Sequence, residues 1–447
     1  MAFSAQGTVG ALPASASYTV IVAALDVVTG DVLWTLRDPA WTTTSGDTEP
    51  ALCLGAAGDL YLAFTTTGTT AGNTNGADAF SFCSPCSGAT AGREDVVLAR
   101  IQQANTLTPS VAWTVQDAYL NSCNRETVPA IAYDASTGRV ILVYETNAST
   151  LCSAPVGSGS NIVVAAMDAV TGAYVWGYQD ALLNSTGSNR APSVAVDAAG
   201  SVYIAYTVTA AVSGGGTLQG VQDVEVVRLR STGPYTVVRD WIASAAGVWN
   251  PGSGATNGAP ALLCDPARGR LFLAFTTTAV QTASVSDMVV LRLRTDTGAL
   301  DWILQSPTYN ASPVGAHQST TALRAAMDSL GQPYIAAAGL DANGDGFTVL
   351  LRPDADVGTT DWAWNDPALP FVYETYLAGA AFAAPRQVVQ ATTTFSVSAM
   401  AVRGGCLHAA FIRPDTRTVV VVGLDQVPTF ADMSAYTYMD QETAICL

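Results

Sequence analysis

The sequence predicts an all-β fold in which four-stranded antiparallel sheets repeat along the chain and are arranged radially as the blades of a β-propeller. Three observations lead to this prediction. Hairpin-like segments with a glycine turn recur, a tryptophan closes a second kind of hairpin at similar intervals, and no helical periodicity separates them. The 447 residues, 49% hydrophobic and only 12% charged, provide a large buried core.

The first half of each repeat is a strand, a tight turn and a second strand. Each run is rich in β-branched and aromatic residues, and glycine stands at the turn, where a positive φ costs it little. The clearest copies are PALCLGAAGDLYLAFT from Pro50, PAIAYDASTGRVILVYE from Pro129, PSVAVDAAGSVYIAYT from Pro192 and PALLCDPARGRLFLAFT from Pro260. Looser copies begin at Ala322 and Ser396.

The second half of each repeat is another hairpin that ends in tryptophan. Residues 24–34 and 166–176 share the pattern Ala-x-Asp-x-x-Thr-Gly-x-x-x-Trp, in which Asp26 and Asp168 are expected to accept hydrogen bonds from turn amides. The tryptophan offers a large flat surface for packing on a neighbouring sheet. The predicted structural tryptophans are Trp34, Trp113, Trp176, Trp241, Trp302 and Trp362.

Third-strand patterns begin near residues 18, 95, 161, 223, 287, 347 and 418. Together with a repeat of about 65 residues, they predict seven blades, and six blades is the alternative. One ring makes residues 1–447 a single domain, with an incomplete first blade at 1–40 and a last blade at about 388–447.

The repeats at 24–34 and 166–176 resemble the tryptophan-docking repeats of PQQ-like propellers and of bacterial SBBP-type propellers. This resemblance implies the fold alone. Quinoprotein dehydrogenases use a vicinal cysteine pair, and no two cysteines are adjacent here, so no quinone cofactor is expected.

Charge and composition exclude several functions. A net charge of −17 opposes binding to nucleic acid and to anionic membranes, and no apolar run approaches the roughly 20 residues of a transmembrane span. The chain has no lysine and only two histidines, His317 and His408. Schiff-base chemistry and histidine-relay hydrolysis therefore have almost no side chains to use.

Eight cysteines suggest an oxidising compartment, although no signal peptide is visible. We expect disulfides among Cys83, Cys86, Cys123 and Cys152, with free thiols as the alternative, whereas Cys53 and Cys264 fall within strand patterns as buried apolar residues. Three glycosylation sequons, at Asn147, Asn184 and Asn310, occur in a chain rich in serine and threonine.

The segment Asp341-Ala-Asn343-Gly-Asp345-Gly resembles the opening of a calcium-binding loop, with oxygen ligands at alternate positions. Its closing acid is missing, because Leu350 and Arg352 occupy the ninth and twelfth positions. A plain turn is the preferred interpretation and a calcium site the alternative. No other cofactor is expected.

Two functions remain. The preferred one is a non-enzymatic structural or recognition propeller, extracellular and exposed on a virion, cell surface or envelope. It would bind other proteins or itself through long loops at 67–94, 209–222 and 365–395. The carboxylates favour this reading because turn hydrogen bonding already explains them. The alternative is a glycan-acting propeller, either a lectin or a glycoside hydrolase, with its site at the channel mouth. A carboxylate–arginine cluster there would favour the alternative.

Overall fold

A computed structural model describes the chain apart from a set of short segments, several longer loops and the C-terminal stretch. Residues outside the description are 10–11, 26–31, 43–45, 69–93, 103, 105, 117–118, 123–124, 148–158, 213–217, 219, 245–248, 250–254, 279–286, 306–318, 329, 341–345, 359, 366–395, 404–405, 414–417 and 425–447. The described residues form antiparallel β-strands with one short 3-10 turn, η1 (Ala56–Gly58). None of the described helices is long and apolar enough to cross a membrane.

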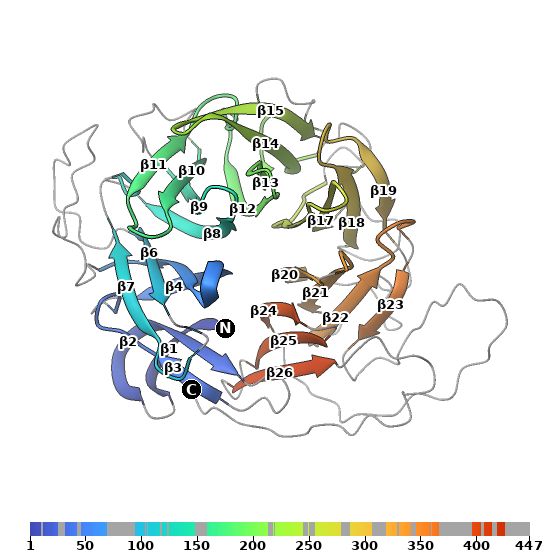
Figure 1. Cartoon of the computed structure of the whole chain (residues 1–447). Coiled ribbons are helices and arrows are strands. Elements are labelled where there is room, and N and C mark those ends of the chain that lie inside the picture. Colours follow the sequence, from blue (N-terminus) through green and yellow to red (C-terminus); the bar gives the residue numbers. More distant parts are fainter. Residues whose placement is uncertain are drawn as a thin grey trace, which may run out of the picture. The chain divides into compact units, whose positions relative to one another are not determined.

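The chain divides into two compact units, and unit 1 (Met1–Asp26 and Val32–Ser253) holds four of the sheets. Each sheet is a meander of sequence-consecutive strands, and the first strands β1, β4, β8 and β12 lie next to one another in that order (Figure 1). The strands are β1 (Ala2–Val9), β2 (Leu12–Leu25), β3 (Val32–Leu36), β4 (Asp47–Leu54), β5 (Leu60–Thr66), β6 (Asp95–Gln102), β7 (Ser110–Val115), β8 (Glu126–Asp134), β9 (Arg139–Thr146), β10 (Asn161–Asp168), β11 (Tyr174–Tyr178), β12 (Asn189–Val196), β13 (Val202–Val208), β14 (Asp223–Gly233) and β15 (Thr236–Ser244).

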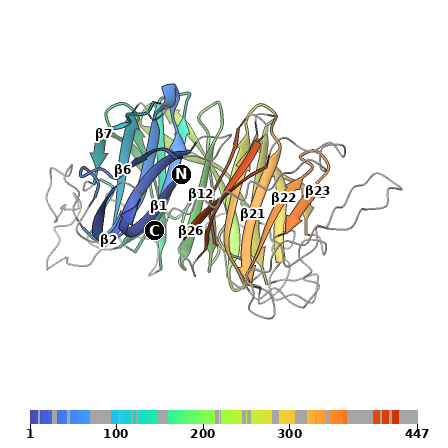
Figure 2. The same ribbon diagram turned by 90° about the horizontal axis from the view of Figure 1, so that it is seen from below.

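Unit 2 (Gly254–Cys446, with Val27–Asp31) holds three further sheets of the same meander type, in which β21 and β22 run side by side (Figure 2). Their strands are β16 (Ala261–Asp265), β17 (Arg270–Thr277), β18 (Asp287–Arg294), β19 (Leu300–Leu304), β20 (Ser319–Met327), β21 (Pro333–Leu340), β22 (Gly346–Pro353), β23 (Thr360–Asn365), β24 (Ser396–Arg403), β25 (Cys406–Arg413) and β26 (Thr418–Leu424). The predicted hairpins and third strands are confirmed. The number of blades and the single-domain boundary stay predictions.

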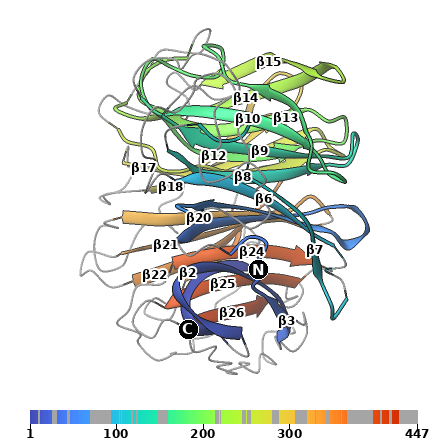
Figure 3. The ribbon, with the colours of Figure 1, turned by 90° about the vertical axis from the view of Figure 1, so that its left-hand side faces the viewer.

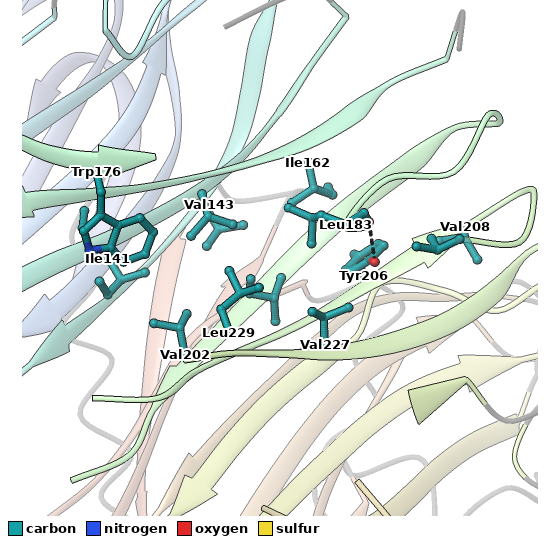
Figure 4. Close-up of a cluster of buried hydrophobic side chains, with 14 residues drawn as sticks. Ile141, Val143, Ile162, Trp176, Leu183, Val202, Tyr206, Val208, Val227 and Leu229 are labelled. Atoms are coloured by element: carbon teal, nitrogen blue, oxygen red, sulfur yellow. Dashed lines mark hydrogen bonds between the residues drawn. The ribbon is translucent and has the colours of Figure 1, made fainter. Parts of the chain in front are cut away.

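Consecutive sheets pack face to face through apolar layers, as the sheets β8–β11 and β12–β15 do in unit 1 (Figures 3 and 4). In that layer Tyr206 is fully buried, and its hydroxyl donates to the carbonyl of Leu183 (Figure 4). The second and third strands are covered on both faces, which explains why β9, β10 and β13 are almost continuously apolar in sequence.

The repeat tryptophans occupy one register position. Each pairs with the strand before it immediately ahead of a bulge, as in Ala24–Trp34, Arg100–Trp113 and Ala166–Trp176. Trp34 and Trp176 are buried, Trp113, Trp241 and Trp302 are half-buried, and the side chain of Trp362 lies outside the description.

Two of these tryptophans pack on a glycine turn of the next sheet. A Cβ atom on Gly172, at φ +73°, would lie 2.9 Å from the Trp113 ring, and one on Gly358, at φ +71°, would collide with the Trp302 ring. Third-strand arginines bridge to the same turns, because Arg100 Nη1 donates to the carbonyl of Val170 (3.0 Å) and Arg292 Nη1 to that of Ala355 (2.6 Å). Glycine, tryptophan and arginine therefore form the contacts between neighbouring sheets at these two turns.

Three first strands of unit 1 share a bulge that the sequence did not predict. Glu49, Val128 and Ala191 have φ values of 55°, 53° and 52°, and each precedes a proline in β4, β8 and β12. The pairing register shifts at each of these positions. A left-handed conformation is unfavourable for residues other than glycine, so each bulge stores strain.

We expect Ala191→Gly to raise the free energy of unfolding by about 0.5 kcal/mol, because relief of about 1–2 kcal/mol of left-handed strain outweighs the added freedom of the unfolded glycine. Ala195→Gly, at an ordinary position of the same strand, is the matched control and should instead lose about 1 kcal/mol. Urea denaturation measures both. An equal loss of unfolding free energy in the two variants would show that Ala191 is not strained.

Candidate functional site

Most residues singled out in the sequence as ligands or disulfides fall outside the described part of the chain. These are the calcium candidates Asp341, Asn343 and Asp345 and the disulfide candidates Cys83, Cys86, Cys123 and Cys152. Their roles stay predictions. Within the described residues, no group of three or more histidine, cysteine or acidic side chains is placed to hold a metal ion. Cys53 and Cys264 lie half-buried on β4 and β16, in the strands where the sequence puts them.

The structure instead places two glutamates near the ends of strands in neighbouring sheets of unit 1, close enough for their charges to interact. Glu49 belongs to the bulge of β4 and is exposed. Its Oε2 accepts hydrogen bonds from the backbone N–H of Val128 in the next sheet (2.8 Å) and from the Thr65 hydroxyl (3.1 Å). Because the β8 bulge takes Val128 out of the strand ladder, its amide is free to orient this carboxylate.

Glu145, near the end of β9, repeats the arrangement one sheet further on. Its Oε1 accepts a hydrogen bond from the backbone N–H of Ala191, the bulge residue of β12, at 2.6 Å. Burial raises the pKa of the Glu145 carboxyl, and the nearby charge of Glu49 raises it further. The Ala191 amide, Arg190 and Arg125 oppose this rise without cancelling it.

Two arginines complete the cluster. Arg125, just before β8, is exposed and forms an ion pair with Glu94, the residue before β6. Arg190 is exposed at the start of β12, next to the Ala191 amide that binds Glu145. We call Glu49, Glu94, Arg125, Glu145 and Arg190 the strand-end cluster. Two of its three carboxyl groups, those of Glu49 and Glu145, lie in different environments, and its two guanidinium groups can donate to hydroxyl or carboxylate oxygens.

Such a pair of carboxylates can perform acid–base chemistry. A carboxyl with a raised pKa keeps its proton to a higher pH than an ordinary carboxyl does and can donate it to a leaving group, while an exposed carboxylate acts as base or nucleophile. The sequence analysis missed these residues, although a signal was present. Glu145 stands where the other copies have Thr65, Thr207 and Thr276, and Glu49 stands where they have valine or alanine.

No family model matches the chain, and no curated protein matches it in sequence. Solved structures do resemble it. The NanB sialidase of Streptococcus pneumoniae is 10% identical with a TM-score of 0.47, and the match covers 87% of this chain and 71% of that one. The α-L-arabinanase of Penicillium chrysogenum is 12% identical with a TM-score of 0.43, covering 84% and 92%. The Hadza microbial sialidase Hz136 is 10% identical with a TM-score of 0.43, covering 86% and 66%.

The fold is a β-propeller. At this level of identity the likenesses bear on the fold alone, and they do not support the resemblance to PQQ-like or SBBP-type repeats in particular.

The predicted function is nevertheless wrong in its preferred form. The propellers that this chain resembles carry the names of glycan-cleaving enzymes, which contradicts both a non-enzymatic structural component of a virion or envelope and the exclusion of an enzyme. The physical reason lies in the carboxylates. We assigned them to turns, as Asp168 indeed is, but Glu49 and Glu145 lie near strand ends, and each accepts a hydrogen bond from a backbone amide of the next sheet.

Proposed function

We propose that the chain is a glycan-acting propeller, specifically a glycoside hydrolase, with its active site at the strand-end cluster. The observation that carries this proposal is the pair Glu49 and Glu145. The two lie close enough for the charge of Glu49 to raise the pKa of Glu145, and each is fixed by a bulge amide of the following sheet. Glycoside hydrolysis commonly uses two carboxyl groups, one as acid and one as base or nucleophile.

The two glutamates take different roles in this mechanism. Glu145, partly buried and with a raised pKa, protonates the glycosidic oxygen as the general acid. Glu49, exposed and held by the Val128 amide and the Thr65 hydroxyl, activates water or attacks the anomeric carbon. Arg125 and Arg190 donate hydrogen bonds to sugar oxygens on either side of the reacting bond.

The charge balance favours a neutral glycan as substrate. With Glu145 protonated, the carboxylates of Glu49 and Glu94 balance the two arginines, and Arg125 is already paired with Glu94, so the cluster has no surplus positive charge for an anionic sugar. The whole chain carries −17, so anionic polysaccharides are repelled at long range. Neutral glycans carry no charge to be repelled and offer the hydroxyl groups that the arginines can bind.

Release of reducing sugar from a panel of polysaccharides tests the proposal. The panel contains neutral arabinan, xylan and β-glucan beside acidic polygalacturonate and a sialylated oligosaccharide. We expect turnover of a neutral member, and its loss in the double variant Glu49→Gln/Glu145→Gln. Binding without turnover would indicate a lectin and contradict hydrolysis. Turnover that survives in the double variant would put the active site elsewhere.

A further inference from the structure

A further glutamate, next to Arg125 of the strand-end cluster, takes no part in the chemistry proposed above. Glu126, the first residue of β8, is fully buried. Its Oε1 accepts hydrogen bonds from the hydroxyls of Ser122 and Thr146, the latter at 2.8 Å. Its Oε2 is also buried and has no hydrogen-bond partner. An ionised carboxylate with one buried oxygen unpaired would be costly. A protonation state in which that oxygen also forms a hydrogen bond is therefore favoured.

The repeat supplies the equivalent position in the next sheet, where Asn189 begins β12. Both residues come two positions before a bulge residue of positive φ, and both accept from a serine hydroxyl four positions earlier. Both main-chain amides donate to the preceding sheet, that of Glu126 to the Glu94 carbonyl (2.7 Å) and that of Asn189 to the Ser160 carbonyl (2.8 Å).

The side chain of Asn189 adds a second hydrogen bond to this contact. Its Nδ2 donates to the same Ser160 carbonyl at 3.0 Å, while Oδ1 accepts from Ser185. The amide therefore acts as acceptor through Oδ1 and as donor through Nδ2, and the shortest of the Nδ2 contacts, to Ser160, clamps β12 to the sheet before it. A carboxylic acid also has one acceptor and one donor, but only when it is protonated.

We propose that Glu126 is a positioning residue of the strand-end cluster and works as a neutral carboxylic acid, with Oε2–H donating to the Glu94 main-chain carbonyl as Asn189 Nδ2 donates to the Ser160 carbonyl. The clamp fixes the segment that carries Arg125 and the Val128 amide, and hence the orientation of Glu49. It also fixes Glu94, the ion-pair partner of Arg125. The catalytic part of this inference rests on the proposed function, and the structural part does not.

The charges around Glu126 favour the neutral form. Asp95 on β6 repels a negative charge there, while Glu94 and Arg125 pair with each other. No described arginine forms an ion pair with Glu126. Burial is the main cause that raises the pKa of Glu126, and the negative charge of Asp95 adds to it. The pKa rises from 4.5 to about 8.

The sign of the pH dependence follows from this direction. The folded chain holds the Glu126 proton more tightly than the unfolded chain does. The stabilisation is therefore complete below pH 4.5, declines as pH rises, and is lost above about pH 8. Above about pH 8 the ionised Glu126 side chain has no proton to donate to the Glu94 carbonyl, and this hydrogen bond is lost.

Urea denaturation of the full chain between pH 5 and pH 9 tests the clamp in the variant Glu126→Gln, whose amide keeps both hydrogen bonds at every pH. We expect the ratio of folded to unfolded chain in the wild type to fall, relative to this variant, by up to tenfold per pH unit until about pH 8. The difference between the two proteins cancels the contribution of Glu225, whose pKa burial also raises to about 8. A pH-independent difference would overturn the proposal.

The reciprocal variant Asn189→Asp is the matched control, because it puts a second carboxyl at the equivalent position. It should be close to wild type at pH 5 and clearly less stable at pH 8. Stability at pH 8 equal to wild type would show that an ionised carboxylate is tolerated there, and would count against the neutral acid.

The positioning role has its own readout. On a glycan that the wild type hydrolyses, the activity of Glu126→Gln relative to wild type should rise as pH increases towards 8, and a ratio that does not change with pH would contradict positioning. If no glycan is turned over, the proposed function fails, but the two denaturation experiments still decide the state of Glu126.

Discussion

Glu145→Gln is expected to lower the rate of glycan hydrolysis by roughly 100- to 10,000-fold, the usual contribution of a general acid. Glutamine keeps the shape of the side chain and can still accept the hydrogen bond from the Ala191 amide, which is 2.6 Å away in the wild type. It cannot donate a catalytic proton. The loss should therefore appear in kcat, with little change in the free energy of unfolding.

The pH profile provides a second measurement on the same pair. Because burial and the Glu49 charge raise the pKa of Glu145, wild-type activity should persist above the pH at which an ordinary glutamate ionises, then fall as Glu145 loses its proton. Glu49→Gln should abolish turnover as well. Asp240→Asn, which removes from β15 the carboxylate that pairs with Arg228 of β14, is the matched control and should leave kcat unchanged. Wild-type rates in both glutamate variants would refute the assignment.

The sheets could be predicted because their physical causes are local. The second and third strands are buried on both faces, so each reads as a short apolar run, and turns punctuate the runs at regular intervals. The third strands begin at Asp95, Asn161, Asp223 and Thr418, where the sequence pattern puts them. Repetition made each weak signal strong.

The cluster could not be predicted because its causes are not local. Glu49 and Glu145 are each held by the backbone amide of a bulge residue in the next sheet. Each of these bulges puts a non-glycine residue at positive φ before a proline. Both the positive φ and the position before proline run against local preference, so propensity gives no warning of them. Searching for what the copies share also hid the informative residues, which are the ones that depart from the repeat.

Asn184 shows how a motif can mislead in the other direction. In sequence it is a glycosylation sequon, but the folded side chain is buried. Its Oδ1 accepts from the Ile162 amide (2.6 Å), and its Nδ2 donates to the Ile162 carbonyl (2.9 Å). The oxygen and the nitrogen of the amide are therefore both hydrogen-bonded to the backbone at the start of β10. Only the tertiary structure distinguishes this role from that of a surface acceptor.

Trp176→Ala is expected to lower the free energy of unfolding by about 3–5 kcal/mol, the usual cost of deleting a large core aromatic side chain. Trp176 is 6% exposed and joins Ile141 and Val202 in the apolar layer between two sheets of unit 1 (Figure 4). Urea denaturation measures the loss.

The half-buried Trp241 provides the comparison that makes this result informative. It occupies the same register position, opposite Arg228 as Trp176 is opposite Ala166, but more of its side chain is exposed to solvent. Trp241→Ala should therefore cost less than Trp176→Ala, because less apolar area returns to water. Equal losses would mean that register, rather than burial, sets the contribution of these tryptophans. No loss in Trp176→Ala would mean that the layer between the sheets does not depend on the repeat tryptophan at all.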